Sequence, residues 1–171
     1  MKNILLILIL ISCVSCFKAS YFKIEDNKFI KKYKVGDILV FKNVQSNKVK
    51  QYKISKINKY HTRVELMAGS KSFHTVDIFI NNGKEFMTFT KIDKEIILFF
   101  QGSRFHELNN YKLYDKKLNL SLSNNKFENI IEIKSSYNTD DTSPIIIYWD
   151  KEFGIIKYET KNGEIWERTN F

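Results

Sequence analysis

Hydrophobic and polar residues alternate one by one along much of this chain. Residues 74–80 and 118–122 both carry apolar side chains at every second position. An alternation of period two is typical of a β-strand that buries one of its faces. Two continuous apolar runs, residues 96–100 and 145–149, instead predict strands that are covered on both faces. The pattern therefore predicts a sheet with both half-buried and fully buried strands.

Turn-forming residues separate these segments. Asn162-Gly163 is the strongest hairpin signal, because this dipeptide readily adopts the positive φ angles of a two-residue hairpin turn. Comparable turn sequences stand at residues 46–47, 81–83 and 124–125. Short strands joined by such turns predict an all-β fold in which an antiparallel meander forms a half-barrel, a barrel or a sandwich.

Helical segments are expected to be short. Residues 26–33 and 103–111 each place apolar side chains at helical spacing, and Ser103 is a candidate N-cap for the second segment. Both segments are shorter than the roughly 12–15 residues at which an isolated helix becomes marginally stable. We therefore expect at most short helical turns, which would depend on packing against the sheet.

The N-terminus has the features of an export signal. Lys2 provides a positive charge, and residues 4–11 form an apolar run. This run is too short for a membrane-spanning helix of roughly 20 residues, but it suits the apolar region of a signal peptide. The segment Leu10-Ile11-Ser12-Cys13 resembles the lipobox of bacterial lipoproteins. The resemblance implies that the peptide before Cys13 is removed and that the Cys13 thiol is lipidated.

Cys16 is the alternative lipidation site. Ser15 precedes it, but Cys13 occupies the third position back, where the lipoprotein family usually carries an aliphatic residue. An ordinary signal peptide or an uncleaved anchor would not require a cysteine at this point. We therefore favour Cys13, which leaves Cys16 as the remaining thiol of the mature chain and allows no intrachain disulfide.

The sequence predicts three parts. Residues 1–12 are the expected signal peptide, residues 13–33 the lipidated cysteine, its tether and the entry segment, and residues 34–171 a single β-rich domain. The chain is 43% hydrophobic and 15% aromatic, which is typical of a globular protein. One proline and six glycines give no sign of a flexible linker to a second domain.

A formal net charge of +9 raises the question of a nucleic-acid partner. Only Arg63, Arg104 and Arg168 among the 28 basic residues are arginines, although arginine is the residue best suited to phosphate and base recognition. The lysines are also dispersed along the chain. We therefore expect no nucleic-acid partner but a solvated lysine surface, whose charge is compatible with a modest attraction to anionic lipid head groups.

No residue pattern predicts an enzyme. The serines next to glycines lack the Gly-x-Ser-x-Gly motif of a nucleophile elbow. His61, His74 and His106 lack the close spacing of metal ligands, and a hydrolase would need one of them beside a carboxylate in a cleft. Neighbouring acidic residues match no EF-hand spacing. We expect no catalytic residue, no metal site and no cofactor.

Aromatic residues are the remaining candidates for a binding site. Fourteen Phe, nine Tyr and two Trp are a large complement for one domain. Core packing and cross-strand pairing are one explanation. The other is a concave sheet that accommodates a lipid, a glycan or an apolar peptide. The candidate lining residues gather around the C-terminal hairpin: Tyr148, Trp149, Phe153, Tyr158 and Trp166.

Three short segments carry a family resemblance. Residues 148–159 read Tyr-Trp-Asp-Lys-Glu-Phe-Gly-Ile-Ile-Lys-Tyr-Glu, residues 162–166 read Asn-Gly-Glu-Ile-Trp, and residues 34–41 read Lys-Val-Gly-Asp-Ile-Leu-Val-Phe. Together with the lipobox they resemble small lipoproteins of Bacteroidota-type bacteria that have no assigned activity. The resemblance implies a cell-envelope β-domain and transfers no catalytic or binding residue. A looser likeness is to the half-barrel lipoprotein carriers of the periplasm, which wrap a sheet around helices.

These observations predict a lipid-anchored cell-envelope protein that acts as a binding or interaction module. The alternative is a periplasmic carrier that holds a lipid or another hydrophobic ligand in a β half-barrel. The expected partners are the membrane, through the N-terminal lipid, and a hydrophobic ligand or an envelope protein. Residues 14–18 lack the acidic run associated with surface export of lipoproteins in related bacteria. We therefore expect the periplasmic face of the outer membrane.

Overall fold

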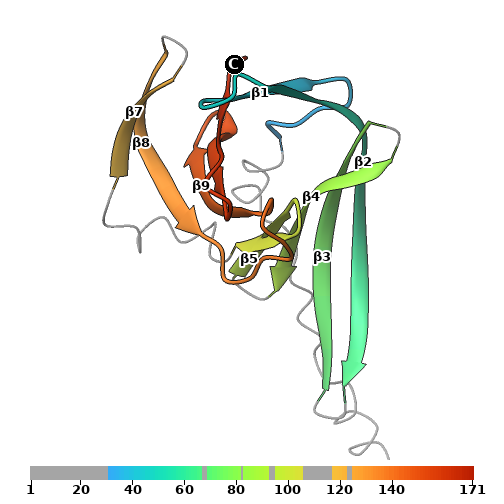
Figure 1. Cartoon of the computed structure of the whole chain (residues 1–171). Coiled ribbons are helices and arrows are strands. Elements are labelled where there is room, and N and C mark those ends of the chain that lie inside the picture. The colour runs from blue at the N-terminus through green and yellow to red at the C-terminus, as the bar shows by residue number, and fades with distance from the viewer. Residues whose placement is uncertain (1–30, 67–68, 82, 93–94, 106–116, 123–124) are drawn as a thin grey trace, which may run out of the picture.

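The computed structural model describes residues 31–66, 69–81, 83–92, 95–105, 117–122 and 125–171. The described residues are all-β and contain no helix, as predicted (Figure 1). None of them forms a helix that could cross a membrane. Cys13, Cys16 and His106 lie outside the described residues, as does most of each segment expected to be a helical turn.

Among the described residues, eleven strands form one antiparallel sheet that curls into a half-barrel, which confirms the predicted class. The spatial order is β6-β5-β4-β3-β2-β1-β11-β10-β9-β8-β7, so neighbouring strands are consecutive in sequence except for β1 and β11, and β6 and β7 lie at the two edges. The strands are β1 (Ile38–Asn43), β2 (Val49–Leu66), β3 (Gly69–Ile80), β4 (Lys84–Ile92), β5 (Glu95–Phe100), β6 (Ser103–Phe105), β7 (Lys117–Leu122), β8 (Asn125–Lys134), β9 (Pro144–Asp150), β10 (Gly154–Thr160) and β11 (Ile165–Arg168).

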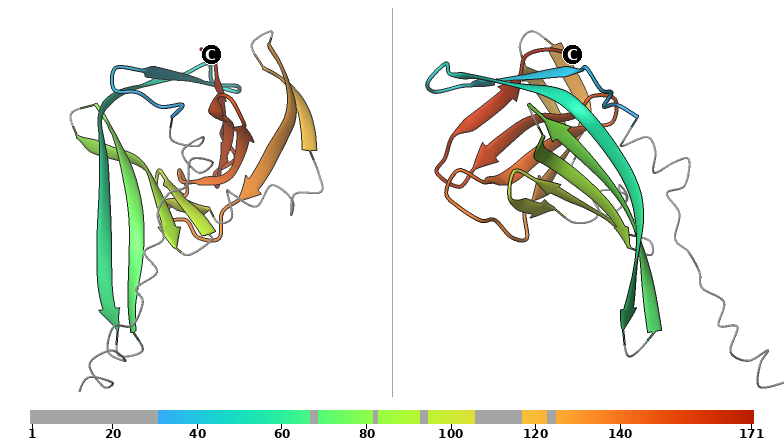
Figure 2. Two further views of the ribbon diagram at one scale, coloured as in Figure 1. Left: turned by 180° about the vertical axis from the view of Figure 1, so that it is seen from behind. Right: turned by 90° about the vertical axis from the view of Figure 1, so that its right-hand side faces the viewer.

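The curl brings β6 against the segment that follows β8. The amide of Arg104 donates to the carbonyl of Tyr137, and the amide of Ser136 donates to the carbonyl of Arg104, each at 2.9 Å. These bonds join two parts of the sheet that lie far apart in the strand order (Figure 2). One face of the sheet therefore encloses an inner core.

The β2–β3 hairpin is much longer than the alternation predicted. The sequence alternates over residues 49–57 and again over residues 63–68, a pattern that predicts two separate strands, but residues 49–66 form the single strand β2. Pairing with β3 continues from Ile54↔Ile80 to Leu66↔Gly69, interrupted by one irregularity between Ile54 and Lys56. The hairpin projects beyond the neighbouring strands (Figures 1 and 2). Continuous pairing with β3 is the reason why the polar stretch between the two predicted segments is also extended.

The predicted hairpin turns lie between paired strands. Gly163 has a φ angle of +85°, and its amide donates to the carbonyl of Thr160 at 2.9 Å. Asn47 has a φ angle of +57° in the β1–β2 turn. Both positions use the left-handed region that glycine and asparagine adopt most readily.

The expectation that Ser103 caps a helical turn is wrong for the described part of that segment. Ser103–Phe105 is the strand β6, which pairs with β5 in the register Leu98↔Phe105. Phe105 is fully buried and extends an inward-facing row that contains Leu98 and Phe89. Burial of this ring against β5 stabilises the strand conformation over the local helical spacing.

Two hydrophobic clusters lie on opposite faces of the sheet. The inner cluster fills the enclosed side and includes Phe41, Phe100 and Tyr158. Tyr33, just before β1, also packs into this cluster with 3% of its surface exposed. The outer cluster is centred on these buried residues: Leu122, Phe127, Ile130, Tyr148 and Ile156.

Candidate functional site

The five aromatic residues predicted to line a site are divided between the two faces of the sheet. Trp149, Tyr158 and Trp166 belong to the inner cluster, with exposed fractions of 1%, 0% and 2%. Tyr148 belongs to the outer cluster, and Phe153 packs against it. Because successive side chains of a strand point to opposite faces, Tyr148 and Trp149 cannot line the same cavity wall.

The three inner aromatic residues are closely packed. The Tyr158 ring stacks on Trp166 at a centroid distance of 6.2 Å, and its edge contacts with Phe41 and Phe100 are both at 5.3 Å. The Trp149 ring meets Phe89 edge to face at 6.2 Å. These contacts join β1, β4, β5, β9, β10 and β11 across the enclosed side. The three rings thus form part of the packed core.

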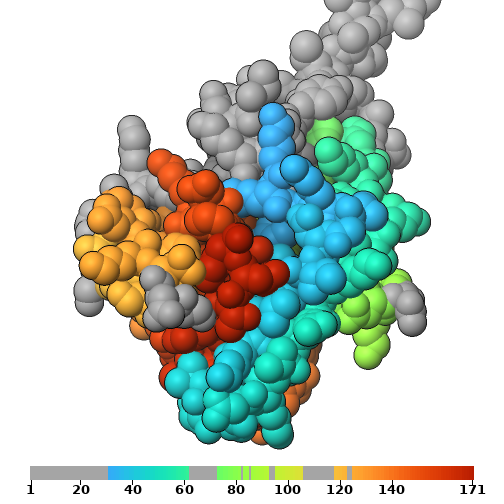
Figure 3. Space-filling model, turned by 90° about the horizontal axis from the view of Figure 1, so that it is seen from above, coloured from blue at the N-terminus to red at the C-terminus, as the bar shows by residue number. Residues whose placement is uncertain are grey.

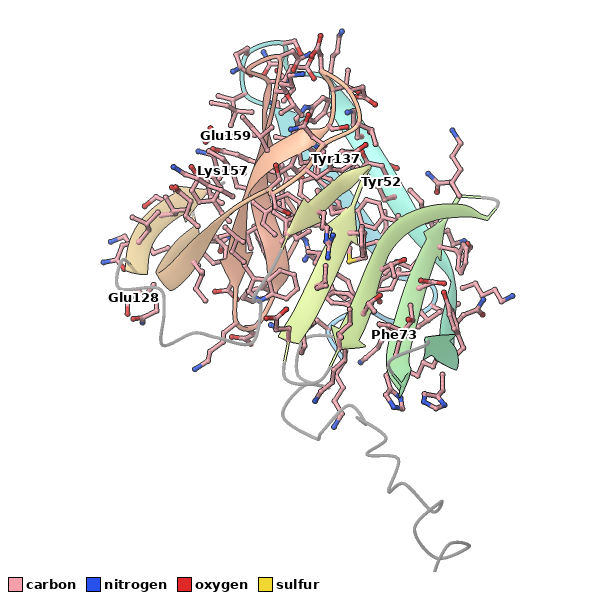
Figure 4. The ribbon with its side chains drawn as sticks, turned by 90° about the horizontal axis from the view of Figure 1, so that it is seen from below. Tyr52, Phe73, Glu128, Tyr137, Lys157 and Glu159 are labelled. Atoms are coloured by element: carbon pink, nitrogen blue, oxygen red, sulfur yellow. The ribbon has the colours of Figure 1, made fainter. Side chains whose placement is uncertain are left out.

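A polar cluster lies on the outer face of β8, β9 and β10. Tyr148 stands between Glu132 on β8 and Lys157 on β10 in the strand register. Its hydroxyl donates to Oε1 of Glu159 at 2.8 Å, and Nζ of Lys157 lies 3.5 Å from the same oxygen. Lys157 Nζ is also 4.7 Å from the centre of the Tyr148 ring. We call Glu132, Tyr148, Lys157 and Glu159 the Tyr148 cluster; Figure 4 labels Lys157 and Glu159.

The Tyr148 hydroxyl acts as a fixed hydrogen-bond donor. Burial raises the pKa of Tyr148, and the nearby carboxylates of Glu159 and Glu132 raise it further because they disfavour a phenolate. The hydroxyl therefore keeps its proton at physiological pH and is unsuited to the role of base or nucleophile. The side chains of Lys157 and Glu159 are only 17% and 27% exposed, so this charge pair is partly shielded from water. The arrangement suits recognition of polar groups rather than proton abstraction.

A row of paired residues across β10, β11 and β1 connects the Tyr148 cluster with a hollow on the surface. Lys157 pairs with Glu167 on β11, which in turn pairs with Lys42 on β1. The hollow has a volume of about 250 Å³ and lies at the β1–β2 turn. In this region β1 (blue to cyan) adjoins the C-terminal residues (red), as Figure 3 shows. Its lining residues are Lys42, Asn43, Val44, Asn47, Glu167 and Thr169. We call the Tyr148 cluster and this hollow together the polar face.

Sequence reasoning missed the polar face. Lys157 and Glu159 occupy alternate positions of an amphipathic strand, a pattern that predicts only a solvent-facing side. Lys42 and Glu167 lie at opposite ends of the sequence and meet because β1 pairs with β11. The register of neighbouring strands, which no local pattern specifies, is what assembles the polar face.

Two of the three histidines lie together. His61 on β2 is opposite His74 on β3, and the rings stack at a centroid distance of 4.5 Å. Lys91 on β4 pairs with His74 from the other side. Within the ranges that the structure describes, no group of three or more His, Cys, Asp or Glu side chains is arranged to hold a metal ion.

The His61–His74 pair predicts a pH dependence of stability. Burial, the His61 ring and the Lys91 ammonium hold the pKa of His74 below its ordinary value of 6.5. As the pH falls through about 6.5, the unfolded chain binds a proton at this position that the folded protein does not bind. Folding is therefore expected to lose stability over this range. His74→Gln should lose less stability than the wild type between pH 7 and pH 5, measured by urea unfolding.

His61→Gln is the matched control for this effect. It leaves His74 buried but removes one of the charges that lower its pKa, so its pH dependence should lie between those of the wild type and His74→Gln. Identical pH profiles for the wild type and His74→Gln would contradict the assignment.

Comparisons with known proteins give no match: no family model, no curated protein and no solved structure is similar to this chain. Function is therefore inferred from the chain's own residues.

Proposed function

We propose that this protein is a lipid-anchored module of the cell envelope that acts by binding or interaction. The observation that supports the proposal most directly is the burial of Trp149, Tyr158 and Trp166, each at most 2% exposed. Because these rings are packed against other core residues, they are not available to line a ligand site. We therefore propose that the protein binds its partner through the outer face of the sheet.

The polar face has the properties of a recognition surface. The Tyr148 hydroxyl and the Lys157–Glu159 pair are held in place by mutual contacts within the sheet. Binding sites commonly use a small number of polar groups whose positions are fixed by a rigid scaffold. Side chains on paired strands also lose less conformational freedom on binding than side chains on a loop. The polar face is therefore the proposed contact surface for an envelope partner.

The alternative function, a carrier of a hydrophobic ligand, is less well supported. A carrier of this shape would hold its ligand on the enclosed side of the half-barrel. Among the described residues, that side is occupied by the inner cluster around Tyr158. A ligand would have to displace aromatic rings whose centroids lie 5.3–6.2 Å apart.

The proposed anchor is a lipid on Cys13, with Cys16 as the alternative residue. Removal of residues 1–12 would place the lipid on Cys13, 25 residues before Ile38, where the first described strand begins. The lysine-rich surface would add a weak attraction to anionic head groups. In the absence of an acidic run after Cys13, we propose the periplasmic face of the outer membrane as its location.

Mass spectrometry of protein extracted from membranes under native conditions tests both parts of the proposal. The wild type and Cys16→Ala are expected to begin at residue 13 with covalently bound acyl chains, whereas Cys13→Ala should carry none. No additional lipid should co-purify without a covalent bond. A wild-type chain without acyl chains would refute the anchor, and a stoichiometric non-covalent lipid would establish the carrier function instead.

A further inference from the structure

The net positive charge of the protein is concentrated in one part of the chain. Residues 31–59 contain nine lysines and a single acidic residue, Asp37, so their net charge is +8, compared with +9 for all 171 residues. Residues 60–171 contain 15 basic and 16 acidic residues, which gives a net charge of −1. Residues 31–59 comprise the segment before β1, the strand β1 and the first part of β2. After residue 30, the excess of basic residues therefore lies entirely in this range.

The strand register places lysines and aliphatic side chains next to one another on the outer face of β1 and β2. Ile38 is directly opposite Lys53, and Lys42 is directly opposite Val49. All four residues are exposed, Ile38 by 45% and Val49 by 55%. Because alternate residues of a strand share a face, Ile38 and Lys42 point away from the inner cluster to which Phe41 belongs. The outer face of this strand pair is therefore both basic and apolar.

The turns on either side of β1 repeat this combination. Lys34 and Val35 are exposed before the strand, and Val44 and Lys48 are exposed after it. Of the eight large hydrophobic side chains that are exposed among the described residues, four lie at positions 35–49. Residues 31–59 (blue to turquoise) form a continuous part of the surface seen from above in Figure 3. We call the outer face of β1 and β2 together with these two turns the basic face.

Few carboxylates oppose the lysines of the basic face. The carboxylate of Asp37 accepts a hydrogen bond from the amide of Lys34 at 2.8 Å, which holds it in the turn before β1. Glu167 on β11 is opposite Lys42, but no ion pair joins the two within the described part of the chain. Lys50 points inward, where its Nζ lies 3.9 Å from the centre of the Trp166 ring. The exposed lysines therefore give the basic face a net positive charge.

This combination of side chains matches the surface of a lipid bilayer. Lysine ammonium groups are attracted to anionic head groups, and neighbouring aliphatic side chains enter the boundary between head groups and acyl chains. The carbon stems of the lysines contribute to the same apolar contact. A nucleic acid would favour arginine, but residues 31–59 contain no arginine. Exposed isoleucine and valine side chains also offer nothing to a soluble polyanion.

We propose that the basic face docks on a membrane surface that contains anionic lipids. The inference deepens the proposed function and rests on it, because it names the part of the domain that meets the membrane. A lipid on Cys13 would keep the domain near the bilayer, and the basic face would turn β1 and β2 towards the head groups. The Tyr148 cluster lies on β8, β9 and β10, so it would stay available to an envelope partner.

Co-sedimentation of the full-length Cys13→Ala protein with lipid vesicles tests the docking surface. Each lysine near an anionic surface contributes about fivefold in affinity. Vesicles that contain phosphatidylglycerol should therefore bind at least about tenfold more tightly than vesicles of phosphatidylcholine alone. Salt at about 1 M reduces the screening length to about 3 Å and should remove this difference. Equal binding to both kinds of vesicle at low salt would overturn the inference.

The double variant Lys42→Gln/Lys53→Gln, made in the same protein, should bind anionic vesicles at least about tenfold more weakly. Lys126→Gln/Lys134→Gln is the matched control, since it removes two exposed lysines from β8, which is separated from β1 by three strands. The control should keep most of its affinity. The apolar residues 4–11 are the same in both variants, so a difference arises from the substituted lysines. An equal loss in both would show that only the net charge matters, and it would overturn the basic face.

Ile38→Ser/Val49→Ser distinguishes a membrane from a soluble polyanion, because it leaves every charge in place. Each buried CH₂ group contributes about 0.8 kcal/mol, which corresponds to about fourfold in affinity, so this variant should lose at least about fivefold in vesicle binding. Tyr137→Ser, at a position that is 62% exposed, should bind normally. The melting temperature checks that each variant is folded. Unchanged binding by Ile38→Ser/Val49→Ser would overturn the membrane as the partner and favour a soluble polyanion.

These outcomes are separate from those that test the anchor. The vesicle measurements use Cys13→Ala protein, which lacks the proposed lipid, so they are unaffected if the wild type carries no acyl chain. Acetylation of the wild-type protein adds a second measurement. Lys42 and Lys53 should react more slowly in anionic vesicles than in detergent, whereas Lys134 should react at the same rate in both. Unchanged rates at Lys42 and Lys53 would overturn the proposed orientation, even if Cys13 is lipidated.

Discussion

Replacing Tyr158 by alanine is expected to lower the free energy of unfolding by about 3–5 kcal/mol, the range measured when large aromatic side chains are removed from protein cores. Tyr158 has no exposed surface, and its ring contacts Phe41, Phe100 and Trp166. These neighbours belong to β1, β5 and β11. The cavity left by the missing ring would therefore weaken the packing between the strands β1–β6 and the strands β7–β11. Urea unfolding followed by tryptophan fluorescence measures the loss.

Tyr137→Ala is the matched control, since it removes the same side chain from a position that is 62% exposed. Its effect should be within about 0.5 kcal/mol, as for most surface substitutions. Tyr158→Phe retains the ring and should keep most of the stability. If Tyr158→Ala lowered the free energy of unfolding no more than Tyr137→Ala, Tyr158 would line an adaptable cavity instead of a packed core. That result would support the carrier function.

Gly154→Ala is expected to destabilise the protein by more than about 2 kcal/mol, because two costs combine. Gly154 has a φ angle of +77°, where an L-residue is disfavoured by roughly 1–2 kcal/mol. A methyl group at this position would also overlap the hydroxyl of Tyr33. That hydroxyl accepts a hydrogen bond from the amide of Ile155 at 3.3 Å, which keeps it close to the strand. Urea unfolding measures the sum of both costs.

Gly163→Ala separates the two contributions. Gly163 has a similar φ angle of +85°, but a methyl group there would meet no atom within 4 Å. We expect only the backbone cost of about 1–2 kcal/mol at that position. The cost of Gly154→Ala should also fall in a Tyr33→Phe background, since the overlapping oxygen is then absent. An equal loss of stability in Gly154→Ala and Gly163→Ala would mean that the Tyr33 side chain moves away from the added methyl group without loss of stability.

The contact between Gly154 and Tyr33 extends the domain towards its N-terminal segment. Residues 13–33 were expected to comprise the lipidated cysteine, a tether and an entry segment; Tyr33, at the end of this range, is 3% exposed and packs in the inner cluster. The preceding residue, Lys32, donates to the carbonyl of Asp150 at 3.1 Å. The final residues of the expected tether are therefore attached to the β9–β10 turn. The apolar spacing of residues 26–33 predicted packing against the sheet, but no local pattern specified the β9–β10 turn as the place where Tyr33 packs.

Prediction from sequence worked best where the signal was local. The alternation at residues 74–80 placed Val76, Ile78 and Ile80 on one face, and all three are buried in the inner cluster. The Asn162-Gly163 turn lies between β10 and β11, as expected. In each case the relevant interaction is between residues that are close in sequence or are repeated at a fixed spacing.

Prediction failed where the outcome depended on distant strands. Ser103–Phe105 became a strand because β5 offered a partner. The candidate aromatic site was drawn from neighbours in sequence, but Tyr148 and Trp149 pack in different clusters. The hollow was missed because Lys42 and Glu167 are brought together only by the β1–β11 pair.

The all-β class, the positions of most strands and the turns between them could be predicted from local sequence patterns. These features follow from side-chain alternation and from the φ preferences of glycine and asparagine, which act over a few residues. The tertiary structure alone decided the pairing of the first strand with the last, the division of the aromatic residues between two faces and the assembly of the polar face. These depend on the register and curl of the whole sheet, which are set by the sum of packing contacts between residues far apart in the chain.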